Sequence, residues 1–304
     1  MKIVCITNDV EATTITGVAY DEKMACRVAS EALPAVLALY KEYGVRATFF
    51  CQGSLVKQHP EIVQMIEGDG HEVACHGWVH DSDKAFDNLS LDEQIDHLKR
   101  AKATIDKYAK TPITSFRAPA LRVNEETVKA LQEAGYTHDS SVASQRLDAF
   151  MSLGSKKKLQ WICAPRSVYE TSDVNLARAG KSGIIEVPVS AWGLPYISTL
   201  MRISPTLTHL TRRLLRWETS HRKNKSVVCF LFHPGEVIEG QKIQHVVKRS
   251  KNPIVHFFSG VLRARLKRRN LGEICVELLE NELSYWKKQG YEFKTVRELY
   301  EYMD

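Results

Sequence analysis

Short apolar runs alternate with longer stretches of helical spacing over the first 140 residues. The runs read as strands at residues 2–9, 47–53, 72–77, 115–119 and 137–142. Between them, apolar residues recur every three to four positions, as in amphipathic helices, at residues 30–44, 60–70, 90–109 and 124–135. This alternation predicts an α/β protein in which helices cover a parallel sheet.

Several helix boundaries are marked by their residues. Gly44 and Gly135 stop two of the helices, and Ser90 with Glu93 forms a capping box at the start of another. The pattern weakens from 143 to 183, where we expect a loop-rich excursion. It returns with strands at 184–190 and 226–233, then a helix and strand within 273–293 and a final helix at 295–303.

The net charge of +6 is unevenly distributed. Residues 199–270 hold 16 Lys and Arg against 3 Asp and Glu, so the basic excess belongs to this part alone. The asymmetry indicates an anionic partner such as a membrane surface, a phosphate-bearing substrate or a nucleic acid, or else a solvated basic face without a partner. We treat 1–304 as a single domain in which 199–270 is a basic, partly helical insertion or extension.

Two segments of this basic part mix apolar and cationic residues. Residues 204–217 place Leu207, Leu210, Leu214 and Trp217 at helical spacing beside Arg212, Arg213 and Arg216. Residues 252–270 combine Phe257, Phe258, Val261 and Leu262 with five cations. Such segments suit helices lying on an anionic membrane surface, although two ordinary helices packed on a barrel would show the same pattern.

Cysteine usage and the first residues indicate the compartment. The seven cysteines are odd in number, lie mostly in apolar runs and form no CxxC pair, which argues against a disulfide framework and a cysteine zinc site. MKIVCITNDVEA does not resemble a signal peptide, and no run approaches the roughly 18 apolar residues of a membrane span. We therefore expect a cytoplasmic protein, at most peripheral at the inner face of the membrane.

Polar residues that could carry chemistry follow the predicted strands. Asp9 and Glu11 stand two positions apart at a strand end, so both carboxylates point to one face. His76 and His80 have the spacing H-x3-H after another strand, and both imidazoles can reach one ion. Two imidazoles and a carboxylate form a zinc-type centre that leaves a coordination position open for water.

Further strand ends add Arg117, Asp139 and His233. The Arg117 guanidinium is suited to orienting a carboxylate, and His233 could protonate a leaving amine. Each of these residues alone has a structural explanation, as a cap, a core histidine or a surface arginine. Their common position at strand ends predicts one active site, because ligands of α/β sheets collect beyond the carboxyl ends of the strands.

In order along the chain, ITNDVE, HGWVH, FRAPALRVNEETVKALQEAGY, DSSV and LFHPGE resemble the motifs of the polysaccharide deacetylase family, also called carbohydrate esterase family four. The resemblance covers about 1–145 and resumes at 184–236. It implies a distorted (β/α) barrel of about seven strands with C-terminal helical additions. It also implies one divalent metal ion, usually Zn²⁺, held by one acid and two histidines.

Roles carried over by the resemblance make Asp9 the general base and Glu11, His76 and His80 the metal ligands. Arg117 would orient Asp9, Asp139 would tune the general acid His233, and Pro119 and Leu231 would contact substrate, with Leu231 against the acyl methyl group. The first motif departs from the family, because most members have adjacent aspartates where this chain reads Asp-Val-Glu. Which of the two acids is base and which is ligand therefore stays open.

The resemblance implies hydrolysis of an N-acyl group, typically N-acetyl, on an amino sugar, including a lipid-linked or cell-surface glycan precursor. One alternative is hydrolysis of another linear amide, by a deformylase or ureide hydrolase. Another is an inactive sugar-binding protein. Nucleic acid is not expected as a partner, because the basic segments contain no recognisable nucleic-acid-binding module.

Overall fold

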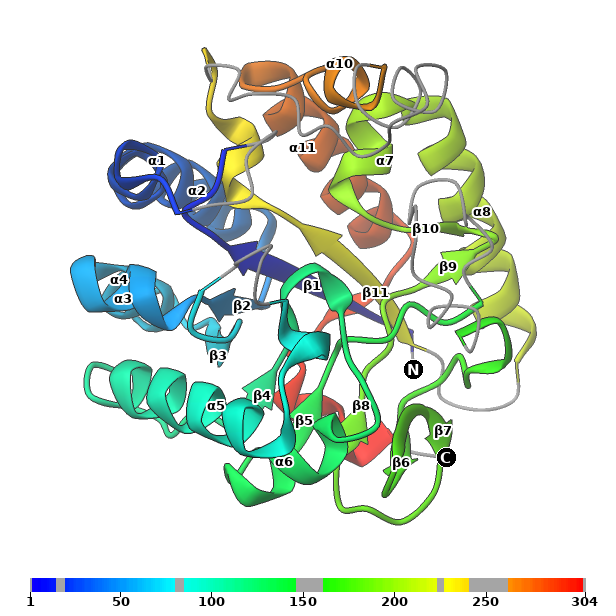
Figure 1. Cartoon of the computed structure of the whole chain (residues 1–304). Coiled ribbons are helices and arrows are strands. Elements are labelled where there is room, and N and C mark those ends of the chain that lie inside the picture. The colour runs from blue at the N-terminus through cyan, green and yellow to red at the C-terminus, as the bar shows by residue number, and fades with distance from the viewer. Residues whose placement is uncertain are drawn as a thin grey trace.

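The computed structural model of the chain describes residues 2–14, 20–79, 85–145, 161–222, 227–240 and 262–302. Within these ranges, seven parallel strands run in the order β11, β1, β2, β3, β4, β5, β8. They are β1 (Ile3–Val10), β2 (Ala47–Cys51), β3 (Glu72–Cys75), β4 (Ser115–Phe116), β5 (His138–Asp139), β8 (Ile185–Glu186) and β11 (Val227–Phe232). The sheet curls, and helices surround it (Figure 1). The predicted distorted barrel of about seven strands is confirmed.

Four of the α-helices described in the first half fall on predicted segments, whereas those at 22–27 and 53–58 were not predicted. The helices of this half are α1 (Glu22–Arg27), α2 (Leu33–Tyr43), α3 (Gly53–Gln58), α4 (Glu61–Gly68), α5 (Leu91–Asp106) and α6 (Thr127–Glu133), with a π-helical turn, η1, at Val28–Ala32. Gly44 ends α2 with a φ of 66°, a left-handed conformation that glycine adopts without strain. The capping box of Ser90 and Glu93 opens α5 as expected.

Irregular backbone links the two ends of the curled sheet. Beyond β5 and β8, Ala143 and Val189 continue the parallel pairing. The next residue, Ser190, donates its backbone N–H to the carbonyl of Cys229 in β11 at 3.0 Å. Further on, Ile197 pairs with Leu231. Between β8 and β11 the barrel is therefore closed by single bridges, together with the two-stranded ribbon of β9 (Ala191–Trp192) and β10 (Leu194–Pro195).

Two sequence predictions were wrong in detail. The stretch 143–183 is not loop throughout, because β6 (Tyr169–Ser172) and β7 (Asn175–Ala179) form a hairpin whose first strand pairs antiparallel with β8. The hairpin forms one end of the sheet, with β7 outermost, and polar residues interrupt both strands, so neither has a continuous apolar run. The segment 295–303, predicted as a helix, contains the 3₁₀ turns η7 (Arg297–Tyr302).

The C-terminal third contributes both helices and sheet. It contains α7 (Ser198–Ile203), α8 (Pro205–His221), α10 (Arg263–Lys267), α11 (Glu273–Lys288) and β12 (Glu292–Phe293), which pairs with β1. The basic range 199–270 includes β11, which pairs with β1 from Ile3 to Asn8, so this range supplies part of the sheet. Most of the apolar and cationic segment 252–270 lies outside the described residues. That the whole chain is a single domain stays a prediction.

A buried ion pair joins α8 to α11. Arg212 donates a hydrogen bond to Glu282 at 2.8 Å, and its guanidinium lies 3.8 Å from the ring centre of Tyr285. Tyr196 donates to the same carboxylate of Glu282 and accepts from the indole N–H of Trp286 at 2.9 Å. Burial raises the pKa of Glu282, although Arg212 and Tyr196 oppose that shift. Arg212 is thus a packing residue and not part of a cationic surface, which corrects its assignment from the sequence.

Replacing Arg212 should therefore destabilise the fold. Arg212→Ala leaves Glu282 buried without its cation, and we expect the free energy of unfolding to fall by about 3–5 kcal/mol. The matched control is Arg213→Ala, which removes an exposed arginine from the same helix and should change stability by less than about 0.5 kcal/mol. Urea denaturation of both variants measures the difference. Equal stability of the two variants would contradict the structural role of Arg212.

Candidate active site

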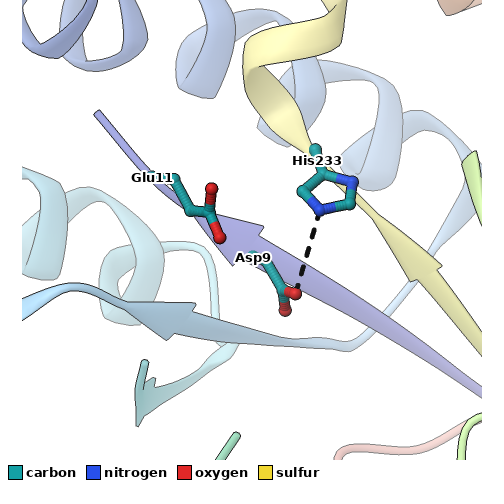
Figure 2. Close-up of side chains that lie close together, drawn as sticks. All are labelled: Asp9, Glu11 and His233. Atoms are coloured by element: carbon teal, nitrogen blue, oxygen red, sulfur yellow. Dashed lines mark ion pairs between the residues drawn. The ribbon is translucent and has the colours of Figure 1, made fainter. Parts of the chain in front are cut away.

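The candidate site lies at the carboxyl ends of β1 and β11. Asp9 belongs to β1 and Glu11 follows it, so the two side chains lie on the same face of the chain. His233 follows β11, the neighbour of β1, and turns its ring toward Asp9, as Figure 2 shows. Its Nε2 lies 4.0 Å from Oδ2 of Asp9. Strand pairing therefore brings together two residues 224 positions apart in the sequence.

A buried guanidinium lies behind Asp9. Arg117 follows β4, is fully buried and donates from one terminal nitrogen to Oδ1 of Asp9 and to the hydroxyl of Thr7, both at 2.9 Å. The other nitrogens donate to the carbonyl and hydroxyl of Ser140, and the ring of Phe50 packs 4.3 Å from the guanidinium carbon. The contact expected between Arg117 and Asp9 is thus present. It leaves Oδ2 of Asp9 directed at the site.

His76 presents one defined nitrogen to the two acids. Its Nδ1 lies 2.9 Å from the carbonyl oxygen of Arg117, which can only accept, so Nδ1 carries the hydrogen. In the neutral ring Nε2 then holds a lone pair, yet it lies 2.8 Å from Glu11 and 3.9 Å from Asp9. Lone pairs facing one another at 2.8 Å repel, so a proton or a metal cation must lie between them.

The protonation of His76 agrees with this conclusion. Burial disfavours the imidazolium, but the charges of Asp9 and Glu11 outweigh burial and raise the pKa of His76. A divalent cation satisfies the same two acids and the same ring nitrogen, and carboxylates with imidazole are donors suited to zinc. The described residues therefore fit a metal ion held by Glu11 and His76.

The rest of the ligand set is less completely defined. His80, the second predicted histidine ligand, lies outside the described residues. Within the described part, Asp9, Glu11 and His233 offer donor atoms that all lie within 4.8 Å of one another. Both acids thus lie within reach of an ion, and their roles as base and ligand stay predictions.

Sequence reasoning missed the support of the loop that carries His76. His97, on α5, accepts the backbone N–H of Trp78 at 2.6 Å through Nε2. Burial lowers the pKa of His97 to about 4, so the ring is neutral and can accept. Gly77 has a φ of +70°, and a Cβ there would meet His97 Nε2 at 2.8 Å. Position 77 therefore requires glycine, because its φ is positive and because a side chain there would collide with His97.

The predicted substrate residues flank the site. Pro119 is buried and opens the 3₁₀ turn η3 (Pro119–Leu121), in which Ala120 and Leu121 have φ values of 54° and 52°. Left-handed conformations at two successive non-glycine residues are strained, and such strain concentrates at functional sites. Leu231 is buried in β11, two residues before His233, and therefore lies on the same face of the strand. The contacts of Pro119 and Leu231 with substrate stay predictions.

Comparison with known proteins points to one family. The family model described as polysaccharide deacetylase matches residues 13–138. The chain is 33% identical over 104 residues to a peptidoglycan-N-acetylglucosamine deacetylase of Bacillus cereus. Residues 13–138 of this chain are thus similar to the polysaccharide deacetylase family. The match covers 34% of this chain and 46% of the Bacillus cereus protein, so the chain spans about half the length of that relative.

Solved structures show the fold of this family over nearly the whole chain. A Mycobacterium smegmatis protein provisionally described as a polysaccharide deacetylase aligns with a TM-score of 0.53 at 20% identity, over 96% of this chain and 92% of that one. A carbohydrate esterase family four pseudoenzyme from Bacillus anthracis aligns with a TM-score of 0.50 at 18% identity, over 99% of this chain and 66% of that one. At these identities the likeness establishes the fold alone.

Asp139 pairs with another acid in this chain. Asp139 and Glu186 are neighbours across β5 and β8, and their buried carboxyls are hydrogen-bonded to each other. Ser141 donates to Asp139 from its hydroxyl at 2.8 Å. Among the described residues no contact of Asp139 reaches His233, so the predicted tuning of His233 has no direct contact behind it. Burial, and then repulsion from Asp139, raises the pKa of Glu186, so the pair holds a proton.

The shared proton should make stability depend on pH. A carboxyl with a raised folded-state pKa contributes most to stability below its unfolded-state pKa, and its contribution falls as pH rises through the folded-state pKa. Glu186→Gln removes this titration. From pH ~5 to ~8 its unfolding free energy should therefore rise relative to wild type, by at most about 1.4 kcal/mol per pH unit. Urea denaturation across this range measures the slope, and exposed Glu133→Gln is the control. A constant difference would exclude the shared proton.

Proposed function

We propose that the protein is a metal-dependent hydrolase that removes an N-acyl group, most simply N-acetyl, from an amino sugar of a glycan. One observation carries the proposal: Asp9, oriented by Arg117, faces the ring of His233 across the site while Glu11 and His76 share a cation position. The Bacillus cereus relative is named for deacetylation of N-acetylglucosamine in peptidoglycan, which supports this class of substrate.

The chain's own groups can perform the two proton transfers of amide hydrolysis. A divalent ion held by Glu11 and His76, with His80 as a further predicted ligand, supplies Lewis acidity toward water and the acyl carbonyl. Asp9 accepts a proton from the attacking water at Oδ2, the oxygen that Arg117 leaves accessible. His233 then donates its Nε2 proton to the amine nitrogen as the C–N bond breaks, and its 31% exposed side chain is open to substrate.

The alternatives differ in substrate or in activity. Another linear amide, such as a formamide or ureide, would use the same groups. The family fold also occurs in the Bacillus anthracis pseudoenzyme, so the fold alone does not imply catalysis. Against an inactive sugar-binding role, the described positions expected to act as base, ligand and acid are filled by competent side chains.

The proposal predicts a metal requirement and separable roles for the two acids. The purified protein should hold about one zinc ion per chain and release acetate from N-acetylglucosamine oligomers. Glu11→Gln should lose the metal, whereas Asp9→Asn should keep it and lose about 10²-fold or more in kcat. The reverse pattern would exchange their roles.

Metal analysis with acetate release measures both effects. Asp9→Asn also removes the partner of buried Arg117, so its denaturation curve must show a folded protein. Exposed Glu133→Gln is the control, because it removes a carboxylate that is neither a proposed ligand nor a proposed base, and it should keep the metal and the wild-type kcat. Metal-loaded wild type that released acetate from no N-acetylated sugar would refute the proposed function.

We further propose that the enzyme acts at the cytoplasmic face of an anionic membrane, on a lipid-linked glycan precursor. Leu207, Leu210 and Trp217 on α8 are 41%, 53% and 57% exposed, and half-buried Leu214 lies between them at helical spacing. The exposed Arg213 lies beside this stripe. Each cation near an anionic surface contributes about 1 kcal/mol to binding. Within the described residues, every helix is too short or too polar to cross a bilayer.

Vesicle co-sedimentation tests this attachment. The wild type should bind anionic phosphatidylglycerol vesicles at low salt and not neutral phosphatidylcholine vesicles, with binding lost as salt rises. The double variant Leu210→Ser with Arg213→Glu should bind at least tenfold more weakly, because it loses apolar contact and reverses a charge. The control Val174→Ser with Arg178→Glu makes the same changes on the hairpin of β6 and β7 and should bind like wild type. If both double variants weakened vesicle binding equally, net charge alone would explain the effect and the proposed contact of α8 with the membrane would be wrong.

A further inference from the structure

A second layer of buried polar residues lies behind the ring of His233. The hydroxyl of Ser198, at the start of α7, lies 3.2 Å from Nδ1 of His233. The carboxylate of Glu236 lies 3.7 Å from the same nitrogen and is hydrogen-bonded to Ser198. Both residues are buried. Nδ1 therefore faces a hydroxyl supported by a carboxylate, while Nε2 faces Asp9.

The local sequence explains the position of Glu236. His233 precedes the 3₁₀ turn η5 (Pro234–Val237), in which the N–H of Glu236 donates to the carbonyl of His233 at 2.9 Å. Pro234 occupies the first position of the turn, where its fixed φ is favourable. Residues i and i+3 lie on the same side of such a turn, so H-P-G-E directs the carboxylate back toward the imidazole.

Arg202 fixes the carboxylate from the other side. This fully buried residue of α7 donates to Glu236 Oε1 at 2.7 Å and to the backbone carbonyls of Lys267 and Arg269 at 2.5 and 2.9 Å. Burial raises the pKa of Glu236, but Arg202 outweighs burial and the net pKa is lowered. Glu236 is thus ionised and held in place, and the C-terminal segment contributes to the active site through backbone carbonyls.

We propose that Ser198 and Glu236, with Arg202 behind them, are positioning residues that hold the His233 ring with hydrogen on Nδ1 and Nε2 toward the scissile amide. The inference rests on the proposed hydrolase function. It assigns to these residues the tuning of His233, which the family resemblance had implied for Asp139. Nδ1–H donates to the Ser198 hydroxyl, whose own hydrogen points to Glu236.

Ser198, Glu236 and Arg202, here called the relay, should affect only the step in which the C–N bond breaks. When the C–N bond breaks, its electron pair goes to the amine nitrogen, which takes the proton from Nε2 of His233, and the ring becomes neutral with its hydrogen on Nδ1. A rotated ring, or one with hydrogen on the wrong nitrogen, cannot deliver that proton. A substrate whose leaving group needs no proton should not depend on the relay. This contrast separates positioning from simple structural damage.

The test compares two substrates in metal-loaded protein. The substrates are N-acetylglucosamine oligomers, an amide, and 4-nitrophenyl acetate, an ester with a stable leaving anion. Ser198→Ala should lower kcat on the amide about tenfold with KM nearly unchanged, and the ester rate should change less than about twofold. Glu236→Gln alone leaves Arg202 buried and unpaired, so the double variant Glu236→Gln with Arg202→Met is the fold-compatible form. It should lose about 10²-fold on the amide and little on the ester.

Matched controls exclude general disturbance. Glu282→Gln with Arg212→Met removes another buried ion pair, between α8 and α11, and should leave the ratio of amide to ester rates unchanged. Rescue by Ser198→Thr, which restores a hydroxyl, should return the amide rate. If the relay variants lose both activities in parallel, or lose bound zinc, the residues support the fold or the metal site and the proposal is wrong.

A readout that needs no turnover separates this inference from the proposed function. Histidine labelled with ¹⁵N gives Nδ1 and Nε2 shifts, and His233→Ala identifies the resonance of His233. In wild type with neutral rings we expect the Nδ1–H form, and in both relay variants a shift toward the Nε2–H form that free imidazole side chains prefer. Wild type that cleaved neither substrate yet showed this pattern would refute the hydrolase and retain the relay. A wild-type ring in the Nε2–H form would overturn the relay.

Discussion

The site depends on a single buried cation, the guanidinium of Arg117. A fully buried arginine must find a partner for its charge and for its donors, and this one finds Asp9, Thr7 and Ser140 on the strands and turns around it. Thr7 and Asp9 lie in β1, Ser140 follows β5, and Arg117 itself follows β4, so the charge can be satisfied only when these three strands lie in their native register. The same interaction that stabilises the centre of the curled sheet also fixes the orientation of Asp9.

Two histidines flank Asp9, and each is fixed by the group at its Nδ1. His76 contacts the carbonyl of Arg117 and His233 contacts the Ser198 hydroxyl, so both rings turn Nε2 toward the acids. They differ in access to solvent, since His76 is fully buried whereas His233 is 31% exposed. A buried ring between two carboxylates suits cation binding. A ring open on one side suits exchange of a proton with substrate.

The sequence predicted the parts of the molecule that local rules determine. Continuous apolar runs gave the parallel strands, and Gly44 and the Ser90 capping box gave helix ends, because these signals depend on a few neighbouring residues. The hairpin of β6 and β7 escaped prediction because polar residues interrupt both strands, so neither has a continuous apolar run. Strand-end acids and histidines could be grouped since strand ends of one sheet meet. Ser198, which contacts His233, and His97, which supports the loop after His76, could not be found this way because both lie on helices.

The neighbours of His233 show why motif resemblance alone gave an incomplete site. Asp139 stands in a motif similar to that of the family, but in this chain its buried carboxyl shares a proton with Glu186 across the sheet. Glu236 lies three residues from His233 within the H-P-G-E turn, and it needed the buried Arg202 to keep its charge. Arg202 in turn donates to the backbone carbonyls of Lys267 and Arg269, in the C-terminal third of the chain. The neighbours of His233 are thus coupled through Arg202 to a part of the sequence that lies outside the family match at residues 13–138.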